Sequence, residues 1–136
     1  MPFVPHGEDP MAASDKPGRV LVVDDEALVC EAVKMMLQFD GHQVVTAASG
    51  REALEILERE KFDVVITDFA MPGMKGDELA AAIKARNPAQ PVVMITAYVE
   101  MLPKPLPGVD FLISKPFLLE NLREAIIKVS PSPKTD

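Results

Sequence analysis

The sequence predicts an α/β protein in which a parallel β-sheet is covered on both faces by helices. Short, wholly apolar segments rich in valine and isoleucine alternate along the chain with longer segments whose apolar residues recur every three or four positions. Continuous apolar runs are typical of strands that are buried on both faces, as in parallel sheets. Because such strands alternate with helices, the helices are expected to pack against both faces of the sheet.

The apolar segments predict five strands, at residues 20–23, 44–45, 64–66, 92–95 and 111–113. A helix over residues 27–38 is predicted, with Gly41 at the position of a C-terminal cap. Its apolar residues at helical spacing are Leu28, Val29, Ala32, Val33, Met36 and Leu37. Three methionines are expected in or near the core: Met35, Met36 and Met94.

Three further helices are predicted. Ser49 and Glu52 have the spacing of a capping box, which opens the first of them. The next contains Leu79, Ala82 and Ile83 and ends at Asn87-Pro88. The last carries apolar residues at helical spacing, namely Leu119, Leu122, Ala125, Ile126 and Val129.

Five strands in this alternation fit a flavodoxin-like, doubly wound parallel sheet with the strand order 2-1-3-4-5. The helix between the fourth and fifth strands, residues 98–110, is predicted to be short or missing. Pro103, Pro105 and Pro107 lie there, and each proline costs a helix interior about 3 kcal/mol. At most about one turn is expected near residues 98–102, followed by an extended, polyproline-like stretch.

A chain of 136 residues is long enough for one domain of ordinary size and too short for two. Residues 18–130 are predicted to form that domain. Residues 1–17 contain four prolines and no hydrophobic periodicity, so we expect a mobile N-terminal tail. Residues 131–136 are expected to be a C-terminal tail.

Composition excludes several classes of function. The net charge of −7 argues against a nucleic-acid partner, because phosphate binding needs a basic surface. The single cysteine, Cys30, cannot form an intrachain disulfide, which fits a reducing compartment. No apolar run approaches the roughly 18–20 residues of a membrane span, and the first residues do not read as a secretory signal. The sequence therefore predicts a cytoplasmic protein without a membrane partner.

Polar side chains follow four of the predicted strands, at the point where each strand ends. Asp24 and Asp25 follow the first strand and Asp68 follows the third, while Thr96 and Lys115 follow the fourth and fifth. Because the carboxyl ends of parallel strands meet at one edge of a sheet, these side chains are expected to converge. Each alone is more often a helix cap, a turn residue or a surface residue, so their joint placement carries the hypothesis.

Clustered carboxylates are the ligands that Mg²⁺ prefers, together with water and phosphate oxygens. A carboxylate held beside Mg²⁺ can attack phosphorus and form an aspartyl phosphate. Lys115 would then supply a fixed positive charge to the phosphoryl oxygens, and Thr96 a hydroxyl donor. The pattern therefore predicts Mg²⁺-dependent phosphoryl transfer at this edge of the sheet.

Four segments together resemble the receiver domain of two-component response regulators, including the receivers at the ends of hybrid histidine kinases. They are residues 20–26 (VLVVDDE), 67–73 (TDFAMPG), 95–97 (ITA) and 115–117 (KPF). The resemblance covers residues 19–129. It implies that Asp68 is the phosphoacceptor, Thr96 the switch hydroxyl and Lys115 the paired cation. The implied Mg²⁺ ligands are the carboxylates of Asp24, Asp25 and Asp68 and the backbone carbonyl of Ala70.

The resemblance also implies partners and limits on activity. A histidine kinase or a histidine phosphotransfer protein is expected to donate the phosphoryl group, and a downstream protein that the sequence does not identify is expected to respond. Only Mg²⁺-dependent self-phosphorylation and self-dephosphorylation are expected, so the chain is not predicted to be an enzyme. The peptide bond before Pro116 is implied to be cis.

One position departs from the family pattern. Receivers usually place an aromatic residue three positions before the lysine, and here that position is Leu112, with Phe111 one residue earlier. Either the strand is shifted by one residue, which would turn each side chain to the other face, or the aromatic residue is absent.

Three other functions compete with the phosphorylation switch. A nucleotide or flavin binder on the same fold is disfavoured, because the acidic loop at Asp24–Asp25 would repel a phosphate. A phosphatase acting through an aspartyl phosphate is disfavoured because Ala70, two residues after Asp68, supplies no acid or base. A protein-interaction module that works without phosphorylation ranks below the switch, because every residue that phosphorylation needs is present.

Overall fold

The central feature of the computed structural model, which describes residues 18–102 and 106–130, is a parallel sheet with the strand order β2-β1-β3-β4-β5. The strands are β1 (Arg19–Val23), β2 (Gln43–Ala47), β3 (Val64–Asp68), β4 (Val92–Thr96) and β5 (Phe111–Ser114). This architecture confirms the predicted fold class and strand order. The segments expected to be tails, 1–17 and 131–136, lie outside the described residues.

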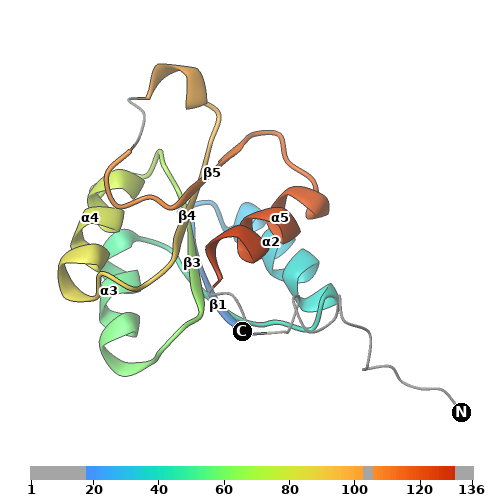
Figure 1. Cartoon of the computed structure of the whole chain (residues 1–136), viewed down its shortest axis with the longest axis horizontal. Helices are drawn as coiled ribbons and strands as arrows, with labels where there is room; N and C mark the ends of the chain where they lie inside the picture. The colour runs from blue at the N-terminus through green and yellow to red at the C-terminus, as the bar shows by residue number, and fades with distance from the viewer. Residues whose placement is uncertain (1–17, 103–105, 131–136) are drawn as a thin grey trace, which may run out of the picture.

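Helices form a layer on each side of the sheet (Figure 1). They are α2 (Ala27–Phe39), α3 (Gly50–Arg59), α4 (Gly76–Arg86) and α5 (Leu119–Val129). α2 and α5 pack over one core, to which β1 and β3 contribute Val20, Val22, Val64 and Ile66. α3 and α4 pack over a second core, formed in part by Leu21, Val23, Val65 and Val92. Alternate residues of each strand thus enter opposite cores, which explains why the strands are apolar throughout.

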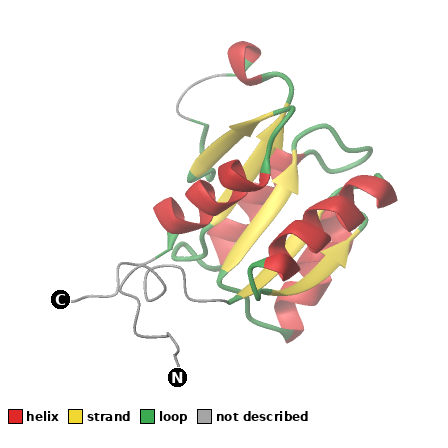
Figure 2. Cartoon of the chain, turned by 90° about the vertical axis from the view of Figure 1, so that its right-hand side faces the viewer, coloured by secondary structure: helices red, strands yellow, loops and turns green. Residues whose placement is uncertain are grey.

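Parallel pairing brings the carboxyl ends of the strands to a common edge, as the arrowheads in Figure 2 show. β1 and β3 are adjacent, with Val23 opposite Thr67, and β3 and β4 are adjacent, with Asp68 opposite Ile95. On the far side of β4, Thr96 lies opposite Ser114 of β5. Every predicted site residue therefore lies on this edge or in the loop directly after it.

Local signals in the sequence fix the helix ends. The hydroxyl of Ser49 accepts a hydrogen bond from the N–H of Glu52 (3.1 Å), and the Glu52 carboxylate accepts one from the N–H of Ala48 (2.8 Å). The predicted cap is thus present, with its return bond one residue before the cap. Gly41 has φ 89°, a conformation that favours glycine, directly after the end of α2.

The connection between β4 and β5 contains one short 3₁₀ turn, η2 (Val99–Met101), in its described part. This confirms the short helix that the prolines predicted. The expected extended stretch includes Pro103 and Pro105, which lie outside the described residues. Farther along, Leu106 is buried and Val109 packs against the core beneath α4. This part of the connection is therefore held to the domain by apolar burial.

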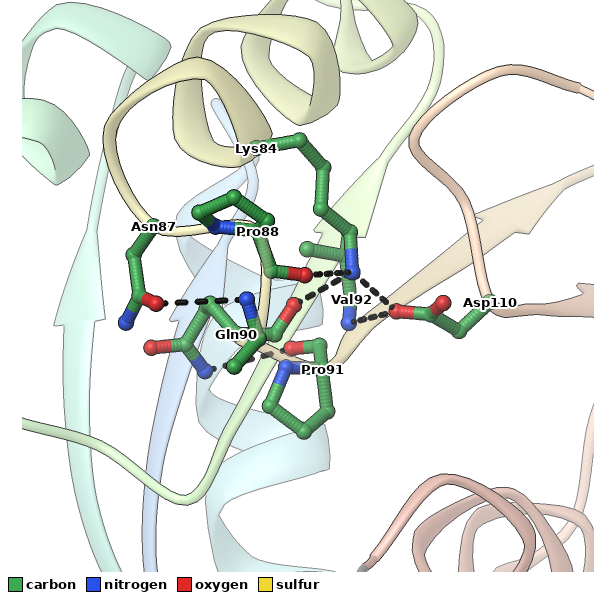
Figure 3. A network of polar contacts seen from close by, with 8 residues as sticks. Lys84, Asn87, Pro88, Gln90, Pro91, Val92 and Asp110 are labelled. Carbon is green, nitrogen blue, oxygen red and sulfur yellow. Dashed lines mark hydrogen bonds and ion pairs between the residues drawn. The ribbon is translucent and has the colours of Figure 1, made fainter.

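Lys84, near the C-terminus of α4, fixes the end of this connection (Figure 3). Its ammonium group donates to the carbonyl of Gln90 (2.6 Å) and to the carboxylate of Asp110 (2.7 Å). The same Asp110 oxygen accepts from the N–H of Val92 (2.8 Å), and the N–H of Asp110 donates back to the carbonyl of Val92 (2.8 Å). The residue just before β5 is therefore held to both α4 and β4.

Substituting Gly108 by alanine is expected to destabilise the fold by about 2 kcal/mol, measured by urea denaturation. Gly108 has φ +83°, and an added Cβ would lie 3.1 Å from the backbone carbonyl of Ala80 in α4. Gly73 is a matched control, because it has φ +76° but no atom within 4 Å of an added Cβ. Gly73→Ala should cost about 1 kcal/mol, the conformational part alone. Equal losses for the two variants would contradict the close approach of this connection to α4.

The outer face of α2 corrects two expectations from the sequence. Leu28 was grouped with the apolar helix face and Met35 was expected near the core, yet they are 85% and 66% exposed. Phe39, on the same helix, is 77% exposed. α2 is apolar on more of its circumference than the sheet can cover, so one apolar face is buried and the other is open. Among the described residues, no helix is both long and apolar enough to cross a membrane.

Candidate functional site

Three carboxylates meet at the edge of the sheet where β1 and β3 end. Asp24 and Asp25 follow β1, and Asp68 is the last residue of β3. One oxygen from each of the three lies within 4.8 Å of the others. Asp24 and Asp68 are buried, while Asp25 is exposed and gives the group access to solvent. An all-oxygen group of this kind has the donor chemistry of a Mg²⁺ site.

Lys115 places a positive charge against this group. Its Nζ lies 2.7 Å from Oδ1 of Asp68. Burial alone would lower the pKa of Lys115, but the hydrogen bond and the charge of Asp68 outweigh that effect and raise it above its usual value. The Lys115–Pro116 peptide bond is cis, as the resemblance implied. One ammonium group facing three carboxylates leaves the site with excess negative charge.

The ionised form of Asp24 is disfavoured at this site, first by burial and then by the neighbouring carboxylates. Burial raises the pKa of Asp24 from 3.8 to about 6, opposed by a hydrogen bond from the N–H of Glu26. Nearby Asp68 and Asp25 raise it further, while Lys115 lowers it. A bound cation would relieve this repulsion, since it favours the ionised carboxylate.

Cys30 lies behind Asp24, on the first turn of α2. Its thiol is 3.3 Å from the backbone carbonyl of Asp24, to which it donates a hydrogen bond. Burial and the charge of Asp24 raise the pKa of this thiol to about 11, so it is not a ready nucleophile. Cys30 is therefore a buried structural residue of α2.

Thr96 ends the strand beside β3 and is buried. Its hydroxyl oxygen accepts a hydrogen bond from the N–H of Tyr98 (2.9 Å) at the start of η2. The hydroxyl proton makes no hydrogen bond within the described ranges, so it is free to be donated. Thr96 therefore joins the edge of the sheet to the connection that follows it.

The loop after β3 is held tightly beneath the site. The N–H of Gly76, the first residue of α4, donates to the carbonyl of Phe69 (2.9 Å). A Cβ at Gly76 would overlap the carbonyl oxygen of Asp68, so no larger residue fits there without a shift of the backbone. Ala70 lies exposed in this loop, two residues after Asp68.

The register of β5 shows which residue occupies the position three before Lys115, where the sequence departs from the family pattern. Phe111 and Ile113 belong to the core under α2 and α5, and Leu112 therefore faces the other side of the sheet. The strand is not shifted, since Thr96 pairs with Ser114 and Lys115 follows directly. Leu112 thus occupies the position three before the lysine, and Phe111 does not replace it.

An apolar groove that the sequence did not reveal adjoins Lys115. It has a volume of about 630 Å³ and runs between α2 and the loop after β5. Its lining residues are Glu26, Leu28, Val29, Ala32, Ala97, Lys115, Pro116 and Phe117. The exposure of Leu28 was the missing signal, because helical spacing alone does not tell a buried face from an open one.

The fold and the acidic edge define a doubly wound α/β domain with a carboxylate-rich site at the topological switch point. The sequence model of the response regulator receiver domain matches residues 20–127. The chain belongs to this family.

Relatives carry the same domain within longer proteins. The chain is 34% identical to the probable transcriptional regulatory protein TcrX of Mycobacterium tuberculosis over 81% of its own length and 48% of TcrX. It is 37% identical to the transcriptional regulatory protein GlrR of Escherichia coli, over 83% of the chain and 26% of GlrR. It is 34% identical to the sensor histidine kinase AruS of Pseudomonas aeruginosa, over 93% of the chain and 13% of AruS. The chain thus spans about half of these relatives or less.

Solved structures match over nearly their whole length. The response regulator TrrA of Thermotoga maritima, in complex with Mg²⁺ and BeF, has a TM-score of 0.76 and 34% identity, covering 82% of this chain and 97% of that one. The chemotaxis protein CheY4 of Vibrio cholerae has a TM-score of 0.75 and 33% identity, covering 83% and 98%. The described fold is therefore that of a receiver.

Proposed function

We propose that the chain is a phosphoacceptor switch in which Asp68 takes a phosphoryl group from a phosphohistidine in a Mg²⁺-dependent reaction. The observation that carries the proposal is the contact of Asp68 with both halves of the site, namely Lys115 at 2.7 Å and the carboxylates of Asp24 and Asp25. An oxygen of Asp68 would form a bond to phosphorus while the bond from phosphorus to the histidine nitrogen breaks. The donor imidazole leaves and takes up a proton.

The proposed cation ligands are the carboxylates of Asp24, Asp25 and Asp68 and the backbone carbonyl of Ala70. The closeness of the three carboxylates supports the assignment, as does the Mg²⁺ in the similar TrrA structure. When bound, Mg²⁺ supplies positive charge to the phosphoryl oxygens. Lys115 would move from Asp68 to a phosphoryl oxygen, and the free hydroxyl proton of Thr96 would be donated to another.

The proposed donor is a histidine kinase or a histidine phosphotransfer protein that docks in the groove beside Lys115. The groove is lined by Lys115, whose Nζ lies 2.7 Å from Asp68, and by Leu28, which is almost fully exposed. The match to AruS, named a sensor histidine kinase, supports a donor of this class. The response is proposed to reach an unidentified downstream protein. Turnover of other substrates is not proposed, because Ala70 offers no acid or base beside Asp68.

Replacing Leu28 by aspartate is expected to slow phosphotransfer from a phosphorylated histidine phosphotransfer protein by about ten-fold or more, because it places a charge in the apolar contact. Uptake from acetyl phosphate should be unchanged, since this small donor needs no docking surface. Ile127→Asp is the control, because Ile127 is exposed on α5 and does not line the groove. Transfer assays on the three proteins would contradict the docking assignment if Leu28→Asp and wild type were equally fast.

The function itself is tested by incubating the protein with acetyl phosphate, with Mg²⁺ or with EDTA, and weighing the intact protein. A gain of one phosphoryl group that requires Mg²⁺ is expected. No gain in a folded protein with Mg²⁺ present would overturn the proposal and favour an interaction module that works without phosphorylation.

A further inference from the structure

A second cavity lies near the amino-terminal ends of the strands, whereas the acidic site lies at their carboxyl ends. It has a volume of about 390 Å³ and lies between the C-terminal halves of α3 and α4, beside the residues that lead into β3. Its apolar wall is formed by Leu54, Leu57, Phe62 and Ile83. Pockets of this size with mainly apolar walls are typical of small-molecule sites. Neither the phosphoryl chemistry nor the docking groove uses any of these residues.

Gln90 gives this cavity a polar side chain on a mostly buried residue, with an oxygen that no described residue contacts as a donor. The residue is 6% exposed and lines the cavity. Its side-chain nitrogen donates to the carbonyl of Pro91 (3.2 Å), while its side-chain oxygen accepts no hydrogen bond from the residues that the structure describes. In Figure 3 that oxygen points away from Lys84 and Asp110, on the side of Asn87, which also lines the cavity. The oxygen is not sealed from solvent, so a donor in the cavity would replace water there and add one hydrogen bond in a mostly buried setting.

The acceptor is held in place before any ligand arrives. The N–H of Gln90 donates to the carbonyl of Asn87 (3.0 Å), and the carbonyl of Gln90 accepts from Lys84 (2.6 Å). The bond to Pro91 fixes which end of the amide is the oxygen. Because the group is already ordered, binding would not have to order it, and this lowers the entropy cost of binding.

The rim of the cavity offers little net charge. Glu58 and Arg86 pair with each other across α3 and α4 (3.2 Å), and Glu60 pairs with Arg19 (2.6 Å). The guanidinium of Arg19 also lies 4.6 Å from the centre of the Phe62 ring, which holds this wall residue in position. Lys61 also lines the cavity, and the two acids and two bases of the lining balance in charge, which favours a neutral ligand over an ion.

We propose that this cavity binds a small neutral molecule with an apolar body and one N–H or O–H donor, which reaches the side-chain oxygen of Gln90. The apolar wall would take the body of the molecule, and Gln90 would fix its orientation. The site is separate from the phosphoacceptor, since it lies at the start of β3 and Asp68 lies at the end of that strand.

Indole is a suitable probe, because it is neutral and planar and has one N–H donor, and 1-methylindole is its match without the donor. Titrations followed by protein NMR should shift the methyl groups of Leu54, Leu57 and Ile83 and the side-chain amide of Gln90. Indole is expected to bind about three- to ten-fold more tightly than 1-methylindole, the net effect of one hydrogen bond.

Substitutions test the apolar wall and the Gln90 acceptor independently. Leu57→Trp fills the cavity and should abolish the shifts, whereas Leu28→Trp, in the groove beside Lys115, should leave indole binding unchanged. Gln90→Leu should make the two probes bind equally, which also serves as an independent test if Leu57→Trp does not fold. No binding of indole up to its solubility limit, shifts located elsewhere, or equal affinities of both probes for the wild type would overturn the proposal.

Discussion

Asp68→Asn will take up no phosphoryl group from acetyl phosphate with Mg²⁺ present, whereas the wild type will gain one. The amide cannot supply the anionic oxygen that attacks phosphorus, and no other described carboxylate shares the same contact with Lys115. The fold should persist, because the substitution preserves the shape of the side chain and removes one of three crowded negative charges. Intact mass spectrometry measures the uptake, and circular dichroism checks the fold.

Asp63→Asn is the matched control for that experiment. Asp63 precedes β3, whereas Asp68 ends it, and it is exposed. Its carboxylate accepts a hydrogen bond from the N–H of Arg19 (2.8 Å), which an amide oxygen can also accept. Asp63→Asn should therefore be phosphorylated like the wild type. Phosphoryl uptake by Asp68→Asn at the wild-type level would contradict the assignment of the acceptor.

Asp24→Asn is expected to be more stable than the wild type and not to be stabilised further by Mg²⁺. The raised pKa of Asp24, about 6 against 3.8, means that the ionised carboxylate is disfavoured in the metal-free fold. A difference of about two pKa units corresponds to roughly 2–3 kcal/mol at pH values well above 6. Removing the charge should raise the free energy of unfolding by about that amount, measured by urea denaturation in EDTA at about pH 8.

The pH dependence gives this prediction a definite sign. Because the folded pKa of Asp24 is raised, the charge destabilises the fold fully above about pH 6, and the effect vanishes below about pH 4, where the group is protonated in both states. The stability difference between Asp24→Asn and the wild type should therefore shrink as the pH falls through this window. A constant difference across it would contradict the electrostatic origin.

Saturating Mg²⁺ provides the second measurement on the same variant. A cation that binds only the folded state raises stability by mass action. Mg²⁺ should therefore stabilise the wild type and the Asp63→Asn control, but not Asp24→Asn, which lacks one of the proposed ligands. Equal stabilisation of all three proteins would show that Asp24 does not hold the cation.

The sequence predicted the strands and helices because two signals, continuous apolar runs and helix-capping side chains, were both strong. Val64–Asp68 is buried along its whole length and begins with a continuous apolar run at residues 64–66. Ser49 with Glu52 marks a helix start by side-chain chemistry. The convergence of Asp24 and Asp68 followed from strand order alone, because parallel strands end at one edge.

What the sequence could not predict depends on packing across elements. The spacing of Leu28 and Met35 is helical, but only the placement of α2 decides which apolar face the sheet covers. The free oxygen of Gln90 depends on a helix end, a loop and a strand start meeting at one point. The prolines after Tyr98 predicted the short turn, but not that Leu106 would be buried or that Val109 would pack against the core.

The two halves of the phosphoryl site follow strands that differ in the number of neighbouring strands with which they pair. The acids come from β1 and β3, each paired with strands on both sides, whereas Lys115 follows β5, which pairs with β4 alone. β5 is reached through a connection whose described part has a single turn and whose end depends on the Lys84–Asp110 contact. Amide hydrogen exchange should therefore be faster at β5 than at β1 and β3, because edge strands open at a lower free energy than central ones. Lys115, which would respond to the phosphoryl group, therefore lies in the half of the site that opens locally more readily.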